Sequence, residues 1–317
     1  MLVTFSIDPA ALHDRDAGAF PGVHTRLIRL WEKYGVLIVP GEKLTASQLS
    51  QAIEKLPLTP RKLWKEAIRQ NLRRKCLPSW SGVSQTSALD DLRRVDGALD
   101  VLLVGQELGS VLGIHVRGSV ATFGSVEVGE LLEVDNVPKF LASVDLCCAD
   151  IGRGESVQQI WDSRFKRLAD FTSSAAVVDR YAANDFWTNR GDSGLHWLIT
   201  QLSRSSVTEL AIFFARQERL REGDVIASLR ECADSVVPSN LRRILAYVND
   251  DAVMRAYAHE RWLRFGKTVC QLGPGIEVLS GQATWRMATC TIKAQGAATR
   301  DSETELRQRG TLHVIRG

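Results

Sequence analysis

The sequence predicts an α/β protein with two domains, and three observations support this prediction. Short apolar runs typical of buried strands alternate with amphipathic helix patterns, most regularly after residue 156. A chain of 317 residues is long enough for two domains of ordinary size. Its composition, 44% hydrophobic and 24% charged, is that of a globular protein. We place the boundary between residues 136 and 155, with domains at about 1–140 and 150–317.

The first domain is expected to open with a strand, a helix and a second strand. Residues 2–7 form a short apolar run that ends at Asp8. Residues 23–34 carry apolar side chains at helical spacing, and the apolar run 36–40 stops at a proline. The capping-box spacing that begins at Thr45 predicts a further helix, which continues to about residue 56.

Residues 61–75 are expected to form a basic amphipathic helix, with Glu66 as its single acid. Such a helix could follow a phosphate backbone, with Trp64 and Trp80 available to stack on bases. The alternative is a solvated helix whose apolar side chains pack on the core. The candidate nucleic-acid contacts are Arg61, Lys62, Lys65, Arg69, Arg73, Arg74 and Lys75.

The end of the first domain contains acidic residues on segments that we expect to be strands. A strand is expected over 99–104, and turns with short strands over 115–134. The apolar run 144–150 reads as a strand that carries two acids, Asp145 and Asp150.

Together with Asp8, these acids are candidate ligands for Mg²⁺ or Mn²⁺, as in metal-dependent nucleases. The opening strand, helix and strand resemble PIN-like nuclease domains. The alternative is that the three carboxylates are helix caps or solvated loop residues.

Strands and helices alternate through the second domain, which indicates a largely parallel sheet. The expected elements are a helix over 157–171, a strand over 175–179, a helix over 194–202, a strand over 209–214, a helix over 225–232 and a strand over 241–248. Three further apolar segments, 257–265, 269–272 and 284–292, follow without long helices between them. They predict an antiparallel extension of the sheet.

His259 and Arg261 are two residues apart in one of these predicted strands. Alternate side chains of a strand project from the same face, and an imidazole beside a fixed cation suits a phosphate oxyanion. Arg180 follows another buried strand, at the carboxyl end where open α/β sheets place ligands. The alternatives are a hydrogen-bonded His259, an Arg261 paired with a carboxylate, and a structural Asp179–Arg180 pair.

Three segments of the second half are AAVVDRY at 175–181, HERWLRF at 259–265 and LGPGIEVL at 272–279. In order and spacing they resemble a phospholipase-D-like domain, in particular the C-terminal domain of MIT-domain proteins and related bacterial domains. They are similar to that family's Asp-x-Tyr strand end, its His-Asp-Arg strand and its glycine turn. The resemblance covers residues 155–310, and acidic segment 302–306 is similar to the family's closing segment.

The resemblance implies a mixed sheet flanked by helices and a phosphate site in which His259 would be catalytic. Arg261 and Arg180 would bind the phosphate. Active phospholipase-D enzymes carry His-x-Lys twice, whereas this chain has one copy, an arginine in place of the lysine, and Glu277 downstream. Phosphate binding tolerates an arginine in place of the lysine better than catalysis does. The one His-x-Arg copy would form half of such a site, and a second copy of the chain in a homodimer could complete it. The most similar family members bind membranes or partners without hydrolysing lipid.

The bulk properties exclude several classes of protein. The net charge of +3 does not by itself indicate a nucleic-acid partner, no apolar run is long enough for a membrane helix, and no secretory signal is expected. Six scattered cysteines favour a cytoplasmic protein with reduced thiols.

Our leading hypothesis is therefore a cytoplasmic prokaryotic protein that recognises phosphate or nucleic acid, has protein partners and belongs to a defence or mobile-element system. The alternatives are a metal-dependent nuclease that acts through the N-terminal carboxylates, and a non-catalytic scaffold that binds a protein partner.

Overall fold

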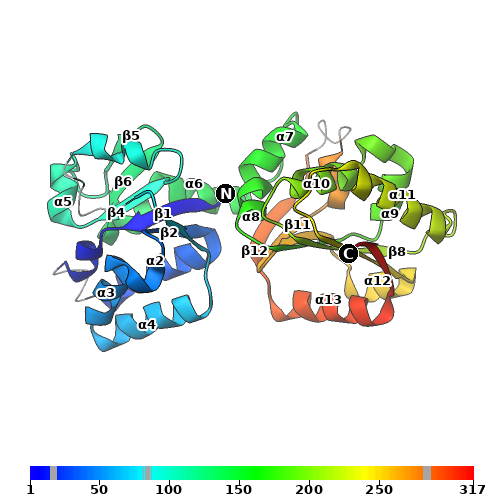
Figure 1. The fold of residues 1–317 in the computed structure, drawn as a ribbon, viewed down its shortest axis with the longest axis horizontal. Coiled ribbons are helices and arrows are strands. Elements are labelled where there is room, and N and C mark those ends of the chain that lie inside the picture. Colours follow the sequence, from blue (N-terminus) through cyan, green and yellow to red (C-terminus); the bar gives the residue numbers. More distant parts are fainter. Residues whose placement is uncertain (15–19, 81, 83–85, 87, 281–286) are drawn as a thin grey trace. The chain divides into compact units, whose positions relative to one another are not determined.

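The computed structural model describes residues 1–14, 20–80, 82, 86, 88–280 and 287–317. Its fold is α/β, with two mixed sheets (Figure 1). The chain divides into two compact units, Met1–Asp145 and Leu146–Gly317, which we call unit 1 and unit 2.

The sheet of unit 1 has the strand order β3-β2-β1-β4-β6-β5. Neighbouring strands are parallel except for the hairpin of β5 and β6. Strands β2 and β3 follow β1 on one side of it, whereas β4, β6 and β5 lie on its other side. The direction in which the chain adds strands to the sheet therefore reverses between β1 and β4. The strands are β1 (Val3–Ile7), β2 (Gly35–Pro40), β3 (Arg74–Leu77), β4 (Val101–Val104), β5 (Val120–Phe123) and β6 (Val126–Glu130).

The core of unit 1 is built on aromatic side chains from its central strand and its helices. Phe5 of β1 makes edge contacts with Trp31 and Phe140, and Trp31 packs on Trp64. The two indoles are fully buried but keep hydrogen bonds, Trp64 to Nδ1 of His24 and Trp31 to a backbone carbonyl. The helices are α2 (Pro21–Tyr34), α3 (Gln48–Lys55), α4 (Leu58–Arg69), α5 (Gln106–Val111) and α6 (Pro138–Cys148).

The basic helix is shorter than expected. It ends at Arg69, and Asn71 adopts a left-handed conformation with φ of 55°. The chain then enters β3, an edge strand that pairs with β2 through Arg74, Lys75 and the two residues after them. The prediction of one helix to residue 75 was wrong because strand pairing, which links distant segments, overrides local helix propensity.

The strand expected over 144–150 is also wrong. Helix α6 begins at Pro138 and continues to Cys148, so Asp145 lies on a helix and Asp150 lies beyond its end. A short apolar run does not distinguish a strand from a buried helix. Arg164, which is buried, donates hydrogen bonds to the carbonyls of Leu146, Ala149 and Asp150 and so holds the end of the helix.

The sheet of unit 2 has the order β12-β11-β10-β7-β8-β9-β13. Strands β7, β8 and β9 are parallel, and the other four strand pairs are antiparallel. The expected antiparallel extension is confirmed, but the expectation of a largely parallel sheet was wrong, because antiparallel strands are added on both sides of the parallel centre. The outer strand β13 was not predicted. The strands are β7 (Ser174–Val178), β8 (Glu209–Ala215), β9 (Arg243–Asn249), β10 (Trp262–Phe265), β11 (Thr268–Leu272), β12 (Cys290–Ala294) and β13 (Thr311–Arg316).

Helices cover both faces of this sheet. In Figure 1, α12 and α13 lie on one face, and α7 to α11 lie on the other. The first face carries a core that includes Phe213, Tyr247, Met254, Trp262 and Leu306. The helices are α7 (Val157–Ile160), which continues through a π-helical turn (Trp161–Phe165) into α8 (Lys166–Asp170), then α9 (Ala182–Asn189), α10 (Gly194–Ser203), α11 (Glu222–Ser235), α12 (Asp251–Tyr257) and α13 (Ala297–Arg309).

Two of the expected strands in this region differ from the structure. The segment 257–265 is a strand only from Trp262, because α12 occupies its beginning and a bend follows the helix. Of the strand expected over 284–292, residues 284–286 lie outside the described residues, and β12 begins at Cys290.

Candidate functional site

The three segments that carry the resemblance meet at one edge of the unit 2 sheet. Strand β10 is antiparallel to β7, and its first residue, Trp262, is paired with the last residue of β7, Val178. Arg261 therefore lies at the edge where Asp179 follows β7. The backbone N–H of Leu272, at the end of β11, donates to the carbonyl of Arg261 at 2.9 Å and brings the glycine turn to the same place.

Asp179 is the centre of this edge. Its side chain is 3% exposed. Oδ1 accepts the backbone N–H of Tyr181 at 2.9 Å, and Oδ2 accepts that of Ile276 at 2.8 Å. The carboxylate thus connects the end of β7 to η8 (Gly275–Leu279), the short 3-10 helix after the glycine turn. Burial raises the pKa of Asp179, although these hydrogen bonds and the charge of Arg261 act in the opposite direction.

Gly275 makes the close approach of the turn possible. Its φ of +73° is in the left-handed region, which favours glycine. A Cβ at this position would lie 2.8 Å from both Cγ of Asp179 and Cδ of Arg261. The glycine turn therefore packs its backbone directly against the two charged side chains.

Arg261 is engaged by the same turn. Its Nη1 donates to the carbonyl of Pro274 at 3.2 Å, and its Nη2 donates to the carbonyl of Gly273. Its guanidinium carbon lies 5.8 Å from the centre of the Tyr181 ring. The structure thus gives Arg261 a role in holding the turn, and neither of the two partners expected from the sequence, a phosphate or a paired carboxylate, is needed to place it.

The expected Asp179–Arg180 pair does not form. Asp179 is buried, and both of its carboxylate oxygens accept backbone N–H groups. Instead Arg180 forms an ion pair with Asp251 at the start of α12, and Asp251 also pairs with Arg255 at 2.9 Å. The guanidinium carbon of Arg180 is 4.9 Å from the centre of the Tyr181 ring, which is 47% exposed.

His259 is not on a strand, so the alternation that would place it on one face with Arg261 does not apply. It lies in the bend between α12 and β10, and its side chain is 89% exposed. Its Nδ1 is 3.4 Å from the carboxylate of the adjacent Glu260, which is itself exposed. A nucleophilic imidazole is normally held inside a cleft and oriented by a second group. His259 instead lies on the surface, so its position differs from that of a catalytic histidine.

The three candidate metal ligands do not gather. Asp8 is buried and caps the short helix after β1 by accepting the N–H of Ala10 at 3.1 Å. Burial raises its pKa, and the nearby Asp14 adds to this. Within the described ranges, no group of three or more His, Cys, Asp or Glu side chains could hold a metal ion. Asp8 thus has the capping role that was the alternative for these acids.

The basic segment of unit 1 presents an exposed surface without exposed aromatic rings. Trp64 is fully buried and Trp80 is 5% exposed, so the expectation that they stack on bases was wrong. The side chain of Arg74 reaches the carbonyl of Ile68, near the end of α4, at 3.4 Å, and thereby joins β3 to that helix. We call the following set the basic surface: Arg61, Lys62, Lys65, Arg69, Arg73, Arg74 and Lys75.

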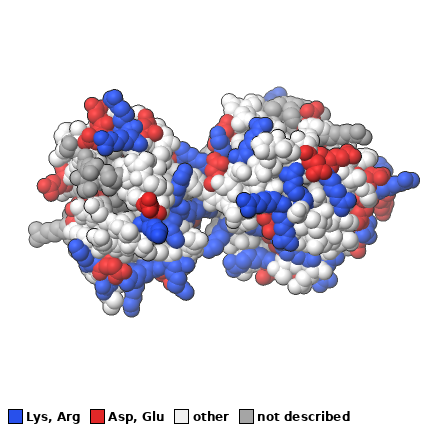
Figure 2. Space-filling model, in the orientation of Figure 1, with Lys and Arg blue, Asp and Glu red and all other residues white. Residues whose placement is uncertain are grey.

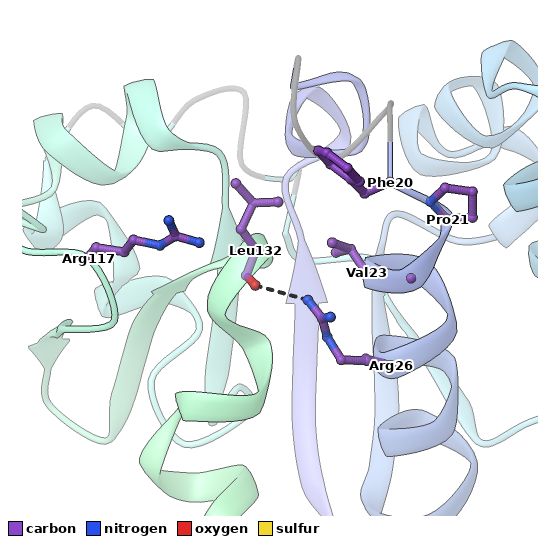
Figure 3. A pocket seen from close by; sticks show the side chains of 7 residues that line it. Phe20, Pro21, Val23, Arg26, Arg117 and Leu132 are labelled. Atoms are coloured by element: carbon purple, nitrogen blue, oxygen red, sulfur yellow. Dashed lines mark hydrogen bonds between the residues drawn. The ribbon is translucent and has the colours of Figure 1, made fainter.

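Unit 1 also contains a pocket of about 430 Å³ beside the start of α2 (Figure 3). Phe20, Arg26, Arg117 and Leu132 are among the residues that line it, and Arg26 donates to the carbonyl of Leu132 at 3.4 Å. A second hollow of about 270 Å³ shares Arg117 and Leu132 with the first and extends to Glu130, at the carboxyl end of β6. Sequence patterns did not indicate this pocket, because its lining comes from three distant segments.

A buried ion pair in unit 2 also went unpredicted. Arg264 of β10 donates from Nε and Nη2 to the two carboxylate oxygens of Glu303 on α13, at 2.6 and 2.9 Å. Both side chains are at most 10% exposed. The sequence signal was available, because Arg264 is a charged residue within an apolar strand and Glu303 lies in the acidic segment 302–306.

No protein-family model matches the chain, and no curated protein matches its sequence. Across the parts of the chain that the structure describes, no helix is both long enough and apolar enough to cross a membrane.

Proposed function

We propose that this chain is a cytoplasmic nucleic-acid-binding protein that contacts the phosphate backbone through the basic surface of unit 1. The observation that carries the proposal is the concentration of cations on α4 and β3. Figure 2 shows Lys and Arg side chains gathered along the lower edge of the unit that contains α4. The six cysteines are free thiols, which is usual for proteins of reducing compartments.

The geometry of α4 suits a polyanion. Arg61, Lys65 and Arg69 are four residues apart, so they form one stripe along the helix, with about 5–6 Å between successive positions. Trp64 and Ala67 are buried and fix the opposite side of the helix to the core. The stripe is therefore held in one orientation by the buried side of the helix.

The existing ion pairs on this surface do not compete strongly with phosphates. Lys65 pairs with Glu54 at 2.9 Å, and Arg69 binds both oxygens of Glu66 at 2.8 Å. All four side chains are close to half exposed or more. Such exposed pairs contribute little free energy, whereas each phosphate contact also releases counterions from the nucleic acid.

For unit 2 we propose a phospholipase-D-like domain that has lost hydrolysis. The proposal is supported by the mutual contacts of the three segments that carry the resemblance, through Asp179, Arg261 and Gly275. The exposed, single His259 argues for a domain that binds rather than cleaves. A defence or mobile-element setting and a homodimer remain parts of this proposal that rest on the resemblance alone.

The experiment is a salt titration of nucleic-acid binding with charge-reversal variants. The Kd of a labelled DNA duplex is measured between low and physiological salt for the wild type and for Lys62→Glu/Lys65→Glu. Loss of two phosphate contacts should weaken binding at least about tenfold at low salt and reduce the slope of log K against log salt by about 1.8.

The matched control is Arg93→Glu/Arg94→Glu, which makes the same change in net charge at two exposed arginines elsewhere in unit 1. It should retain the wild-type slope. If both double variants bind equally well, the basic surface is not the contact. If the wild type shows no salt-dependent binding to DNA or RNA, the proposal fails, and a scaffold that binds a protein partner becomes the better account.

A further inference from the structure

Tyr181 presents an exposed aromatic ring beside two arginines at the carboxyl-end edge of the unit 2 sheet. The ring is 47% exposed, and the guanidinium carbons of Arg180 and Arg261 lie 4.9 and 5.8 Å from its centre. Among the exposed large hydrophobic side chains in the described part of unit 2, Tyr181 is the one that carries an aromatic ring. An aromatic ring with adjacent cations is the combination that binds a base and its phosphates.

The structure holds this group in place before any ligand arrives. The backbone N–H of Tyr181 donates to Asp179, which is itself fixed by the glycine turn. Arg261 is anchored by the carbonyls of Gly273 and Pro274, and Arg180 by Asp251. Little conformational entropy would be lost on binding, because the side chains are already positioned.

The charged group on the Arg180 side of the ring carries a net positive charge. Asp251 is shared by two arginines, Arg180 and Arg255, so the positive charge of this trio exceeds its negative charge by one. Arg261 binds carbonyl oxygens and faces the buried Asp179. A guanidinium has five N–H donors, and the two bonds of Arg261 to carbonyls use only part of that capacity.

We infer that the edge of unit 2 binds single-stranded nucleic acid, with a base stacked on Tyr181 and the adjacent phosphates held by Arg180 and Arg261. This inference rests on the proposed nucleic-acid function and names its ligand more narrowly. A single strand is required because the faces of the bases in a duplex are already stacked on their neighbours. A ring on a protein surface reaches them only when they are unpaired.

The test compares a short single-stranded oligonucleotide with a duplex of the same length at one salt concentration. Tyr181→Leu should weaken single-strand binding about fivefold or more, since base stacking contributes about 1–3 kcal/mol. Duplex binding should not change. A 2-aminopurine base in the single strand should be quenched on binding to the wild type and to Tyr181→Phe, which keeps the ring, but not on binding to Tyr181→Leu.

His259→Ala serves as a control at the same edge and should bind like the wild type. Circular dichroism spectra and melting temperatures check that the variants fold, as expected for substitution of an exposed side chain. If Tyr181→Leu binds single strands normally while the Lys62→Glu/Lys65→Glu variant loses salt-dependent binding, this inference is wrong and the proposed function stands. If the wild type binds neither nucleic acid, both are wrong.

Discussion

Gly275 and Asp179 are packed so closely that a Cβ on the glycine would lie 2.8 Å from Cγ of the carboxylate. The residue after Gly275, Ile276, donates its backbone N–H to the same carboxylate at 2.8 Å. This contact joins two segments 97 residues apart in the chain. It is the structural reason why the Asp179 strand end, the Arg261 segment and the glycine turn form one assembly.

Gly275→Ala should destabilise unit 2 by about 2–5 kcal/mol. The new methyl group would displace the Asp179 carboxylate, leave the N–H of Ile276 without its acceptor, and occupy a left-handed conformation that disfavours alanine. Urea unfolding followed by circular dichroism measures the change. The control is Gly223→Ala on α11, where a Cβ would meet nothing within 4 Å and helix propensity predicts equal or slightly greater stability. Equal stability of both variants would contradict the role of the contact.

Glu303→Gln should destabilise the protein by about 3–5 kcal/mol, because it leaves the buried charge of Arg264 without a counter-charge. Replacing both partners, as in Arg264→Met/Glu303→Leu, should recover much of that loss, since two apolar side chains of similar size need no compensation. Thermal unfolding of the two variants decides between these outcomes. A double variant that is less stable than Glu303→Gln would show that the pair contributes more than charge compensation.

The free energy of unfolding of Asp185→Asn should increase relative to that of the wild type as the pH rises. Asp185 is a buried residue of helix α9, and burial raises its pKa above the usual value near 3.8. A carboxyl group of this kind contributes stability that is complete below its unfolded pKa and is lost as the pH rises through its folded pKa. The carbonyl oxygen of an asparagine can accept the N–H of Gly194 without this loss, and its amide N–H can donate to Asn189 once the Asn189 amide is turned to present its oxygen.

The measurement for Asp185→Asn is the free energy of unfolding from about pH 3.5 upward for both proteins. The difference should grow in favour of the variant through the window above the unfolded pKa and then stay constant. A constant difference over the whole range would show that Asp185 titrates alike in the folded and unfolded chains.

His259→Ala should change neither stability nor nucleic-acid binding by more than about 0.5 kcal/mol, because the side chain is 89% exposed and its Nδ1 lies 3.4 Å from a carboxylate, that of Glu260, which is itself exposed. Incubation of a phosphodiester substrate with chelator present tests the remaining question. Metal-independent cleavage by the wild type that disappears in His259→Ala would overturn the assignment of unit 2 as non-hydrolytic.

Local patterns predicted much of unit 2. The strands at 209–215 and 243–249 are largely apolar runs because both of their faces are buried, and helix α11 between them covers the predicted helix at 225–232. The same reasoning failed at residues 144–150, where residues 144–148 belong to helix α6. In a segment this short, the hydrophobic period and the length of the apolar run do not distinguish a strand from a helix.

The sequence by itself determined the α/β class and the antiparallel extension of the second sheet, and it singled out the three segments around Asp179, Arg261 and Gly275. Only the tertiary structure decided what those side chains contact: that Arg261 binds turn carbonyls, that Arg180 pairs with Asp251, and that His259 faces solvent. The physical reason is that burial and hydrophobic period are properties of neighbouring residues along the chain. The partner of a charged side chain instead depends on which distant segments share one sheet edge.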